Sequence, residues 1–273
     1  MLSISNRSSA AVNVTILAIQ KAARVLVRDF GELEKLQVSS KSLSLFALTA
    51  AKRAEHILLE DLSAARPEYD ILTEGRGEIL AASPRSKFDQ NGGFRWIINP
   101  LDGAINFLHG IPHFSISVAI EHHGEPIAGV VHNPITSELF WGEKGKGAFL
   151  NNQRIRVSGR RTLESALIGL GSPFGFGKME RAAQCLKMIL SKVHAFRHLG
   201  ANSLDLAFVA AGRLDAFFEA GAPLWTSAAG SVLVREAGGS ASPWMNGVVA
   251  SNEPLHKDIL KMITSATTEK NSF

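Results

Sequence analysis

The spacing of apolar residues changes along the chain, and these changes limit the folds that it can adopt. From residue 8 to about residue 36, apolar side chains such as Val12, Ile16 and Ile19 recur at three- and four-residue steps, which predicts an amphipathic helix. A second stretch of this kind runs from about residue 45 to residue 65. It ends before Pro67, whose ring disfavours helical geometry at the preceding residue.

Strand patterns follow the two predicted helices. Short β-rich runs occur at 69–73 and 94–98, separated by a polar, glycine-rich loop. The run 113–122 alternates, with Phe114, Ile116 and Val118 on one face, and further strand signals lie at 127–132, 138–141 and 148–150. A glycine-rich run at 142–147 separates the last two and is typical of a structural turn. This succession predicts a meander of antiparallel strands.

The pattern changes again after about residue 158, where strands and helices alternate. Strands are predicted at 166–170, 215–219 and 248–250, and helices at 178–193, 201–211, 225–237 and 256–265. Such alternation is typical of α/β architecture. We therefore expect an α/β chain with two parts: an N-terminal α+β half over 1–157 and a C-terminal α/β half over 158–273.

Composition excludes several classes of protein. The 273 residues are 45% hydrophobic and carry a net charge of +4, which fits a packed globule and excludes disorder. The charges form no block of the kind that marks a nucleic-acid-binding arm. One cysteine, Cys185, allows neither an internal disulfide nor a thiolate metal site, so a reducing, cytoplasmic environment is expected.

Several further sequence features argue against special functions or favour ordinary structural roles. No uninterrupted apolar run is long enough to predict a membrane span, and the stretch 10–19 lacks the cleavage site of a signal peptide. His122 and His123 are neighbours on a predicted strand and so point to opposite faces, which argues against a shared metal ion. Cys185 lies within a predicted helix among apolar residues and is expected in the core, while Arg160 and Arg161 lie in a predicted solvated turn.

The most informative segment is Trp96-Ile97-Ile98-Asn99-Pro100-Leu101-Asp102-Gly103-Ala104-Ile105-Asn106-Phe107. An apolar strand leads into a proline turn and then into a predicted helix. Backbone N–H groups at a helix start favour an anion, so a phosphate group could bind there. The alternative is that Asp102 only caps the helix and Gly103 only eases the turn.

This segment resembles the signature of the inositol monophosphatase family, Asp-Pro-Leu/Ile-Asp-Gly-Thr-x-Asn-Phe. The resemblance extends to the family's Glu-Glu loop at 69–77, its glycine-rich hairpin at 145–150 and its C-terminal Trp-Asp helix at 222–239. The run 107–114 is closer still to the bacterial branch called extragenic suppressor protein SuhB. The resemblance implies an αβαβα layered sandwich with an antiparallel N-terminal sheet, usually found as a homodimer.

Family members hydrolyse phosphate monoesters with Mg²⁺, and the resemblance implies an incomplete set of metal ligands here. Positions that keep a family ligand are Glu74, Asp102 and the backbone carbonyl of Leu101. Positions where the family has an acidic residue and this chain does not are Ala51, Gly75, Asn99 and Thr226. Ala104 replaces the threonine that helps to activate the attacking water.

The loss of carboxylates predicts weak or absent Mg²⁺ binding, because closely spaced carboxylates offset the cost of dehydrating the ion. Asn99 could still offer a carbonyl oxygen. Phosphatase activity is therefore expected to be absent or severely reduced. A rearranged site that uses Glu78 is an alternative, although Glu78 more simply reads as a solvent-facing loop residue.

Substrate contacts follow from the same resemblance. The backbone of Gly103 and Ala104 corresponds to the phosphate cradle, and the family's inositol-facing positions correspond to Gly200, Ala201, Asn202 and Glu219. From the pattern alone, Glu219 would instead be a solvated strand end. His109 and His113, next to the signature, could contact a phosphate or simply pack in a loop.

Two functions remain open at this point. The first is a Mg²⁺-dependent phosphatase acting on inositol monophosphate or a similar small phosphate ester. The second is a non-catalytic binding protein, because the SuhB branch is associated with transcription antitermination and ribosomal RNA maturation through RNA polymerase and its Nus factors. An intact fold with degraded ligands is compatible with the second role.

Overall fold

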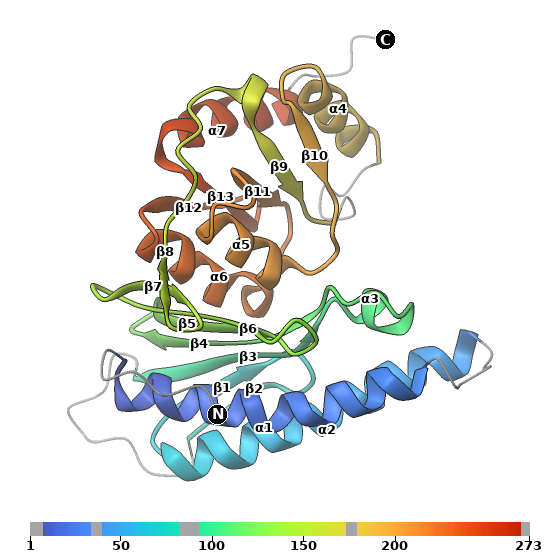
Figure 1. Cartoon of the computed structure of the whole chain (residues 1–273), viewed down its shortest axis with the longest axis vertical. Helices are drawn as coiled ribbons and strands as arrows, with labels where there is room; N and C mark the ends of the chain where they lie inside the picture. The colour runs from blue at the N-terminus through green and yellow to red at the C-terminus, as the bar shows by residue number, and fades with distance from the viewer. Residues whose placement is uncertain (1–7, 34–39, 82–92, 173–178, 269–273) are drawn as a thin grey trace.

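The N-terminal helices form as their apolar spacing predicts. A computed structural model of the chain describes residues 8–33, 40–81, 93–172 and 179–268. Helix α1 spans Ala10–Leu33 and buries Val12, Ile16, Ile19 and Leu26, while α2 spans Ser40–Ala65 and begins earlier than expected. The two helices pack side by side on one face of a sheet (Figure 1).

That sheet has eight strands in the order β2-β1-β3-β4-β5-β6-β7-β8. Their bounds are β1 Asp70–Thr73, β2 Gly77–Ile79, β3 Phe94–Asp102, β4 Ser115–His122, β5 Glu125–Asn133, β6 Glu138–Glu143, β7 Gly147–Leu150 and β8 Gln153–Ile155. The predicted antiparallel meander is present from β3 to β8, whereas β1 and β3 pair in parallel. The sequence analysis missed β2 and β8, because strands this short offer no periodicity.

The C-terminal half contains a second sheet in the order β10-β9-β11-β13-β12. Its elements are the 3₁₀ turn η1 Leu163–Ser165, β9 Leu167–Leu170, α4 Met179–Leu190, β10 Ala195–Arg197, α5 Asn202–Ala210, β11 Ala216–Glu219, α6 Leu224–Glu236, β12 Gly239–Trp244, β13 Gly247–Asn252 and α7 Glu253–Thr268. Strands β9, β10 and β11 are parallel, as expected for α/β architecture, and β13 and β12 are antiparallel additions.

The layers follow the order helix, sheet, helix, sheet, helix. Helices α1 and α2 cover one face of the eight-stranded sheet, α5 and α6 fill the space between the two sheets, and α4 and α7 cover the far face of the second sheet (Figure 1). Apolar residues of both halves share one core, in which Ile97 and Val131 of the first sheet pack with Leu204 and Leu233 of the middle helices. The predicted αβαβα sandwich is confirmed.

Several minor predictions can be compared directly with the structure. Cys185 is a buried core residue, and burial raises the pKa of its thiol to about 11. Within the run 142–147, residues 144–146 form the turn between β6 and β7, and the other residues belong to these two strands. Glu78 faces solvent as expected, but it lies on strand β2, where it pairs with Arg95 at 3.4 Å.

By length and composition alone, helix α1 could span a membrane. The sequence analysis did not predict this, because it searched for an uninterrupted apolar run. In the structure, its apolar face instead packs against α2 and the first sheet, where Ala18, Ala22 and Leu26 are buried. A core helix of this kind passes the same compositional test, so the test alone assigns no membrane role.

Candidate functional site

The signature residues lie where β3 ends in the middle of the molecule. Asn99, Leu101 and Asp102 are 1%, 4% and 7% exposed, and the pairing of β3 with β4 is irregular between Asn99 and Asp102. Gly103 adopts a left-handed conformation with φ of 84°, which glycine tolerates best. Helix α3, Ala104–Leu108, follows, so the predicted strand and helix are present, whereas the predicted proline turn is wrong because Pro100 lies within β3 and the turn falls at Gly103.

Asp102 does not cap α3. The N-cap residue is Gly103, and no side chain forms a capping hydrogen bond at this end of the helix. Its Oδ2 instead accepts the backbone N–H of Ser203, in the first turn of α5, at 2.6 Å. Burial raises the pKa of Asp102 to about 7, the Ser203 N–H opposes that rise, and Asp205 and Glu219 add to it. The alternative role considered for Asp102, a cap of α3, is therefore wrong, and its carboxylate interacts with the start of α5 instead.

Asn99 lies opposite Ser117 of β4, so both side chains project to the same face of the sheet. The Ser117 hydroxyl is 3.0 Å from the Ser203 hydroxyl, which is also 3.0 Å from the backbone oxygen of Thr226 in α6. In contrast, Oδ1 of Asn99 is buried and has no hydrogen-bond partner among the described residues. This unpartnered acceptor marks a gap in an otherwise connected polar cluster.

Glu74 follows β1, and its backbone N–H bonds to the oxygen of Ile98 at 3.4 Å, which places Glu74 beside the carboxyl end of β3. Desolvation, and then the nearby Glu55, raise the pKa of Glu74. The sequence analysis missed Glu55, a carboxylate on α2 that is only 2% exposed. It accepts the Thr73 hydroxyl at 2.5 Å and lies 3.5 Å from Nε of Arg76.

Gly75 is in close contact with Glu55. A Cβ atom at position 75 would lie 2.6 Å from Oε1 of Glu55, closer than real Cβ atoms approach. The Glu55 carboxylate therefore occupies the space into which a side chain at Gly75 would extend. The signal that could have identified Glu55 is an acidic residue directly after Ala54 on the buried side of an amphipathic helix.

The remaining positions of the predicted metal site carry no charge. Ala104 is the first residue of α3. Both Ala104 and Ala51 of α2 are partly buried, and they pack against the apolar core that α1 and α2 form with the first sheet. The Thr226 hydroxyl donates to the backbone oxygen of Pro223 at 2.8 Å in the first turn of α6. Across the described residues, no group of three or more histidine, cysteine, aspartate or glutamate side chains has the geometry to hold a metal ion.

The predicted substrate positions gather at the start of α5. Gly200 is left-handed with φ of 84°, and Ala201 and Asn202 lead into the helix. Glu219, at the end of β11, is 5% exposed, so its interpretation as a solvated strand end is wrong. It accepts the backbone N–H of Ser172 at 2.9 Å and the side-chain amide of Asn202, which occupies both of its carboxylate oxygens.

His113 and His109, which flank the signature, differ in environment. His109 is exposed, whereas Nε2 of His113 lies 2.7 Å from Oδ1 of the fully buried Asp205 in α5. The other oxygen, Oδ2 of Asp205, has no partner among the described residues. Burial raises the pKa of Asp205, and the His113 contact opposes that rise. The pair joins the loop after α3 to α5, so the packing role considered for His113 is supported.

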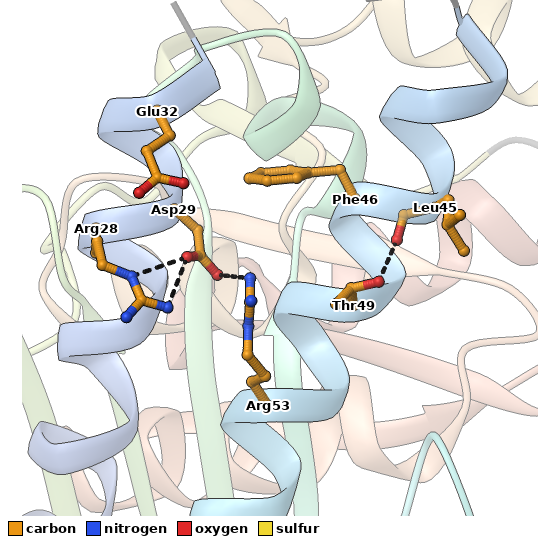
Figure 2. Close-up of a pocket in the computed structure, with 7 residues that line it drawn as sticks. All are labelled: Arg28, Asp29, Glu32, Leu45, Phe46, Thr49 and Arg53. Carbon is orange, nitrogen blue, oxygen red and sulfur yellow. Dashed lines mark hydrogen bonds and ion pairs between the residues drawn. The ribbon is translucent and has the colours of Figure 1, made fainter. Parts of the chain in front are cut away.

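A separate cavity of about 410 Å³ lies between α1 and α2 and is lined by neither Glu74 nor Asp102. Figure 2 shows its centre, where the buried Asp29 contacts Arg28 at 3.2 Å and Arg53 at 2.5 Å. Glu32 and Phe46 line the same space. Since two arginines accompany two carboxylates, the cavity has no excess charge, and the Asp29–Arg53 ion pair connects the two helices.

Comparison with known proteins identifies the family. A model of the inositol monophosphatase family matches residues 8–270. The chain belongs to this family. An inositol-1-monophosphatase of Rhizobium meliloti is 44% identical over 93% of this chain and 96% of its own length. The Nus factor SuhB of Escherichia coli is 34% identical over 91% of this chain and 94% of its own length.

Solved structures of the inositol monophosphatase family agree with the fold. The extragenic suppressor protein SuhB of Bartonella henselae superimposes with a TM-score of 0.81 at 38% identity, covering 94% of this chain and all of that one. An inositol monophosphatase from Anabaena superimposes with a TM-score of 0.79 at 27% identity, over 93% of this chain and 94% of that one. Both the predicted family and its layered architecture are confirmed.

Proposed function

We propose that this member of the inositol monophosphatase family is a pseudoenzyme whose hydrolysis of phosphate monoesters is absent or severely reduced. The observation that carries the proposal is Asn99, a neutral and buried side chain near the end of β3 whose Oδ1 has no hydrogen-bond partner among the described residues. In a working metal site this position would face the cation. Here it contributes an amide oxygen and no charge.

The physical reason is the preference of Mg²⁺ for about six oxygen ligands, several of them anionic. Glu74 and Asp102 are the carboxylates at the predicted ligand positions, and Leu101 offers its backbone oxygen. One oxygen of Asp102 already accepts the Ser203 N–H, which leaves the other oxygen for a cation. These residues therefore do not fit a Mg²⁺ ion well, and weak or absent binding is the expected result.

The remaining groups retain features suited to binding a small phosphate ester without turnover. The backbone of Gly103 and Ala104 lies at the start of α3, and Gly200 and Ala201 precede α5. The Asn202 side chain bonds to Glu219, so a polyol hydroxyl would have to compete for that carboxylate. We infer that inositol monophosphate, if it binds, does so weakly.

The test compares the wild-type chain with a variant that carries Asn99→Asp and Thr226→Asp. We expect titration calorimetry to show no Mg²⁺ binding by the wild type, and we expect no phosphate release from inositol 1-phosphate. The variant should regain Mg²⁺ binding, because two carboxylates return to the site. Position 75 is left unchanged, since a side chain there would require the Glu55 carboxylate to move.

Tight Mg²⁺ binding and ready turnover by the wild type would contradict the proposal and restore the phosphatase function. A matched control is Asp258→Asn on α7, which removes an exposed carboxylate outside the candidate site and should alter neither measurement. Should only the variant bind Mg²⁺ and release phosphate, the wild type has lost a site that its fold can still support.

The second candidate function is that of a binding protein in transcription antitermination and ribosomal RNA maturation. It is favoured by relatives named Nus factor SuhB, among them those of Escherichia coli and Pseudomonas aeruginosa. We propose that such a protein would be cytoplasmic, would form a homodimer and would contact the RNA polymerase and Nus-factor assembly. Asp102→Ala should then leave partner binding intact in a pull-down with purified components, whereas a shared catalytic role would reduce it.

A further inference from the structure

A second cleft, of about 470 Å³, lies along the outward face of α6, outside the signature site. The turn between β4 and β5 forms one wall, with Gly124 and Pro126, and the hairpin of β12 and β13 forms the other, with Ala241 and Val248. Helix α6 is the floor, and it contacts β12, β13 and β5 (Figure 1). Clefts of this size, apolar with a few polar groups, are typical of ligand sites.

The floor carries a regular row of polar side chains. Ser227, Ser231 and Arg235 follow one another at four-residue steps, so they project from the same face of α6. Ser227 and Ser231 are only 8% and 9% exposed, and neither hydroxyl has a hydrogen-bond partner within the part of the chain that the structure describes. Both residues line the cleft, so their hydroxyls are available to a ligand that can hydrogen-bond to them.

Arg235 provides the charge at one end of this row. It is the one charged residue among the described residues that line the cleft, and it is exposed. Its Nη2 donates to the backbone oxygen of Pro126 at 3.2 Å, and no described carboxylate lies within ion-pair distance. The remaining N–H groups of the guanidinium are therefore available to an anion.

The two nearest carboxylates are occupied elsewhere. Glu125 accepts Nζ of Lys144 at 2.8 Å, while Glu236 accepts the backbone N–H groups of Gly145 at 3.0 Å and Gly147 at 2.8 Å. Partial desolvation lowers the pKa of Arg235, and these two carboxylates oppose that shift only in part. Neither neutralises the guanidinium directly, so the cleft favours a ligand with a negative charge at one end.

The spacing of the serines favours an extended peptide over a simple fatty acid. One helical step of four residues rises about 6 Å, and two residues of an extended strand rise about 6.6 Å. Carbonyl groups on one side of an extended peptide thus recur at nearly the spacing of Ser227 and Ser231. An alkyl chain would leave both hydroxyls unpaired.

We propose that this cleft, Ser227, Ser231 and Arg235 with its two apolar walls, binds an extended peptide segment of a partner protein that carries a carboxylate against Arg235. The peptide lies along α6 and is not added as a strand to β12, because Pro243 lacks the N–H that such pairing needs. The inference does not depend on whether the chain hydrolyses phosphate esters.

The experiment uses ¹⁵N-labelled full-length protein and pools of acetylated tetrapeptides in which three positions are randomised among uncharged residues. One pool ends in aspartate amide, a second in alanine with a free carboxylate, and a third in alanine amide, so the first two distinguish a side-chain carboxylate from a chain terminus. We expect at least one anionic pool to shift the amide resonances of 227–235 and 241–248. The neutral pool should bind at least about tenfold more weakly.

Two variants test the residues directly. Arg235→Gln should weaken the anionic pool at least about tenfold, and Ser231→Leu should abolish binding by filling the cleft. Arg161→Gln, which removes an exposed arginine that does not line the cleft, should bind like the wild type. Ser231→Val is a smaller change at the same position. A thermal melt of each variant shows whether a loss of binding comes from a blocked cleft or from misfolding.

The proposal is wrong if no pool shifts these resonances, if the neutral pool binds equally well, or if Ser231→Val and Arg235→Gln bind like the wild type. It is also wrong if an oligonucleotide, dodecanoate or simple dilution of the protein shifts the same resonances and the peptides do not. Those last outcomes would assign the cleft to a nucleic acid, to an amphiphile or to a second copy of this chain.

Discussion

At the residue scale, Asp102 shows how burial changes the chemistry of a single group. Its carboxyl is 7% exposed, and its pKa rises from 3.8 to about 7 because ionisation in the interior is costly. The Ser203 N–H opposes this rise without cancelling it. The folded chain therefore holds a proton at Asp102 over a pH range in which the unfolded chain has released it.

The resulting prediction concerns stability against pH in the presence of EDTA. Because the folded pKa is the higher one, the contribution of Asp102 is fully present below about pH 4 and is lost as pH rises to about 7. The loss amounts to about 4 kcal/mol. Asp102→Asn should remove this dependence, so urea denaturation should show a larger gain over the wild type at pH 8 than at pH 4.

The control for this prediction is Asp258→Asn, which changes an exposed carboxylate on α7. It should leave the slope of stability against pH close to that of the wild type. Parallel slopes for the wild type and Asp102→Asn would show that Asp102 ionises in the folded chain much as it does in water.

At the element scale, α1 and α2 are joined by two ion pairs in different environments. Asp29 is 1% exposed as a side chain and contacts Arg53 at 2.5 Å, whereas Lys21 and Asp61, also across the two helices, are 53% and 29% exposed. A carboxylate that loses its partner in the interior is costly, while an exposed pair contributes little.

Arg53→Gln should therefore lower the free energy of unfolding by about 2 kcal/mol, since Asp29 keeps only Arg28 as a charged partner. Lys21→Gln serves as the matched control and should cost less than about 1 kcal/mol. Urea denaturation of both variants measures the difference. Equal losses would mean that the buried carboxylate is compensated by other groups.

The packing of α6 on the first sheet also depends on one close approach. A Cβ atom at Gly129 of β5 would lie 2.4 Å from the backbone oxygen of Ala229, and a backbone cannot yield as a flexible side chain can. By contrast, a Cβ atom at Gly31 of α1 would meet nothing within 4 Å.

Two alanine substitutions test this contact. Gly129→Ala should lower the free energy of unfolding by about 2 kcal/mol or more, because α6 must shift away from β5. Gly31→Ala should raise it by about 0.5 to 1 kcal/mol, because alanine is the better helix former. Thermal or urea unfolding distinguishes them, and a neutral Gly129→Ala would show that α6 moves at little cost.

At the scale of the whole molecule, the two predicted halves share their middle layer. Helices α5 and α6 bury apolar residues against both sheets, so neither half keeps a complete core without the other. We therefore expect one cooperative unfolding transition. Circular dichroism should follow all helices, and fluorescence should follow Trp96 and Trp141 in one half and Trp225 and Trp244 in the other.

Urea curves from the two methods should coincide. Separate midpoints, or an intermediate that keeps helical signal after the tryptophan change, would indicate that the division near residue 158 marks two independently folding domains. The variant Trp225→Phe, Trp244→Phe leaves fluorescence from the N-terminal half alone and would assign any early transition.

Much of the architecture was accessible from the sequence because it depends on local patterns. The periodicity of α1, the alternation of β4 and the motif around Asp102 and Gly103 each lie within a short stretch, and together they indicated the layers and the family. The edge strands β2, β8, β10 and β12 were missed, because a short or polar edge strand carries little pattern of its own and forms through its neighbours.

The sequence by itself determined which carboxylates are absent from the candidate site, since residue identity needs no coordinates. Only the tertiary structure decided how the remaining groups are used. It directed Asp102 to Ser203, placed Glu55 against Gly75, left Asn99 without a partner and exposed the serines of α6 to a cleft. Each of these outcomes depends on packing between distant segments, which no local pattern encodes.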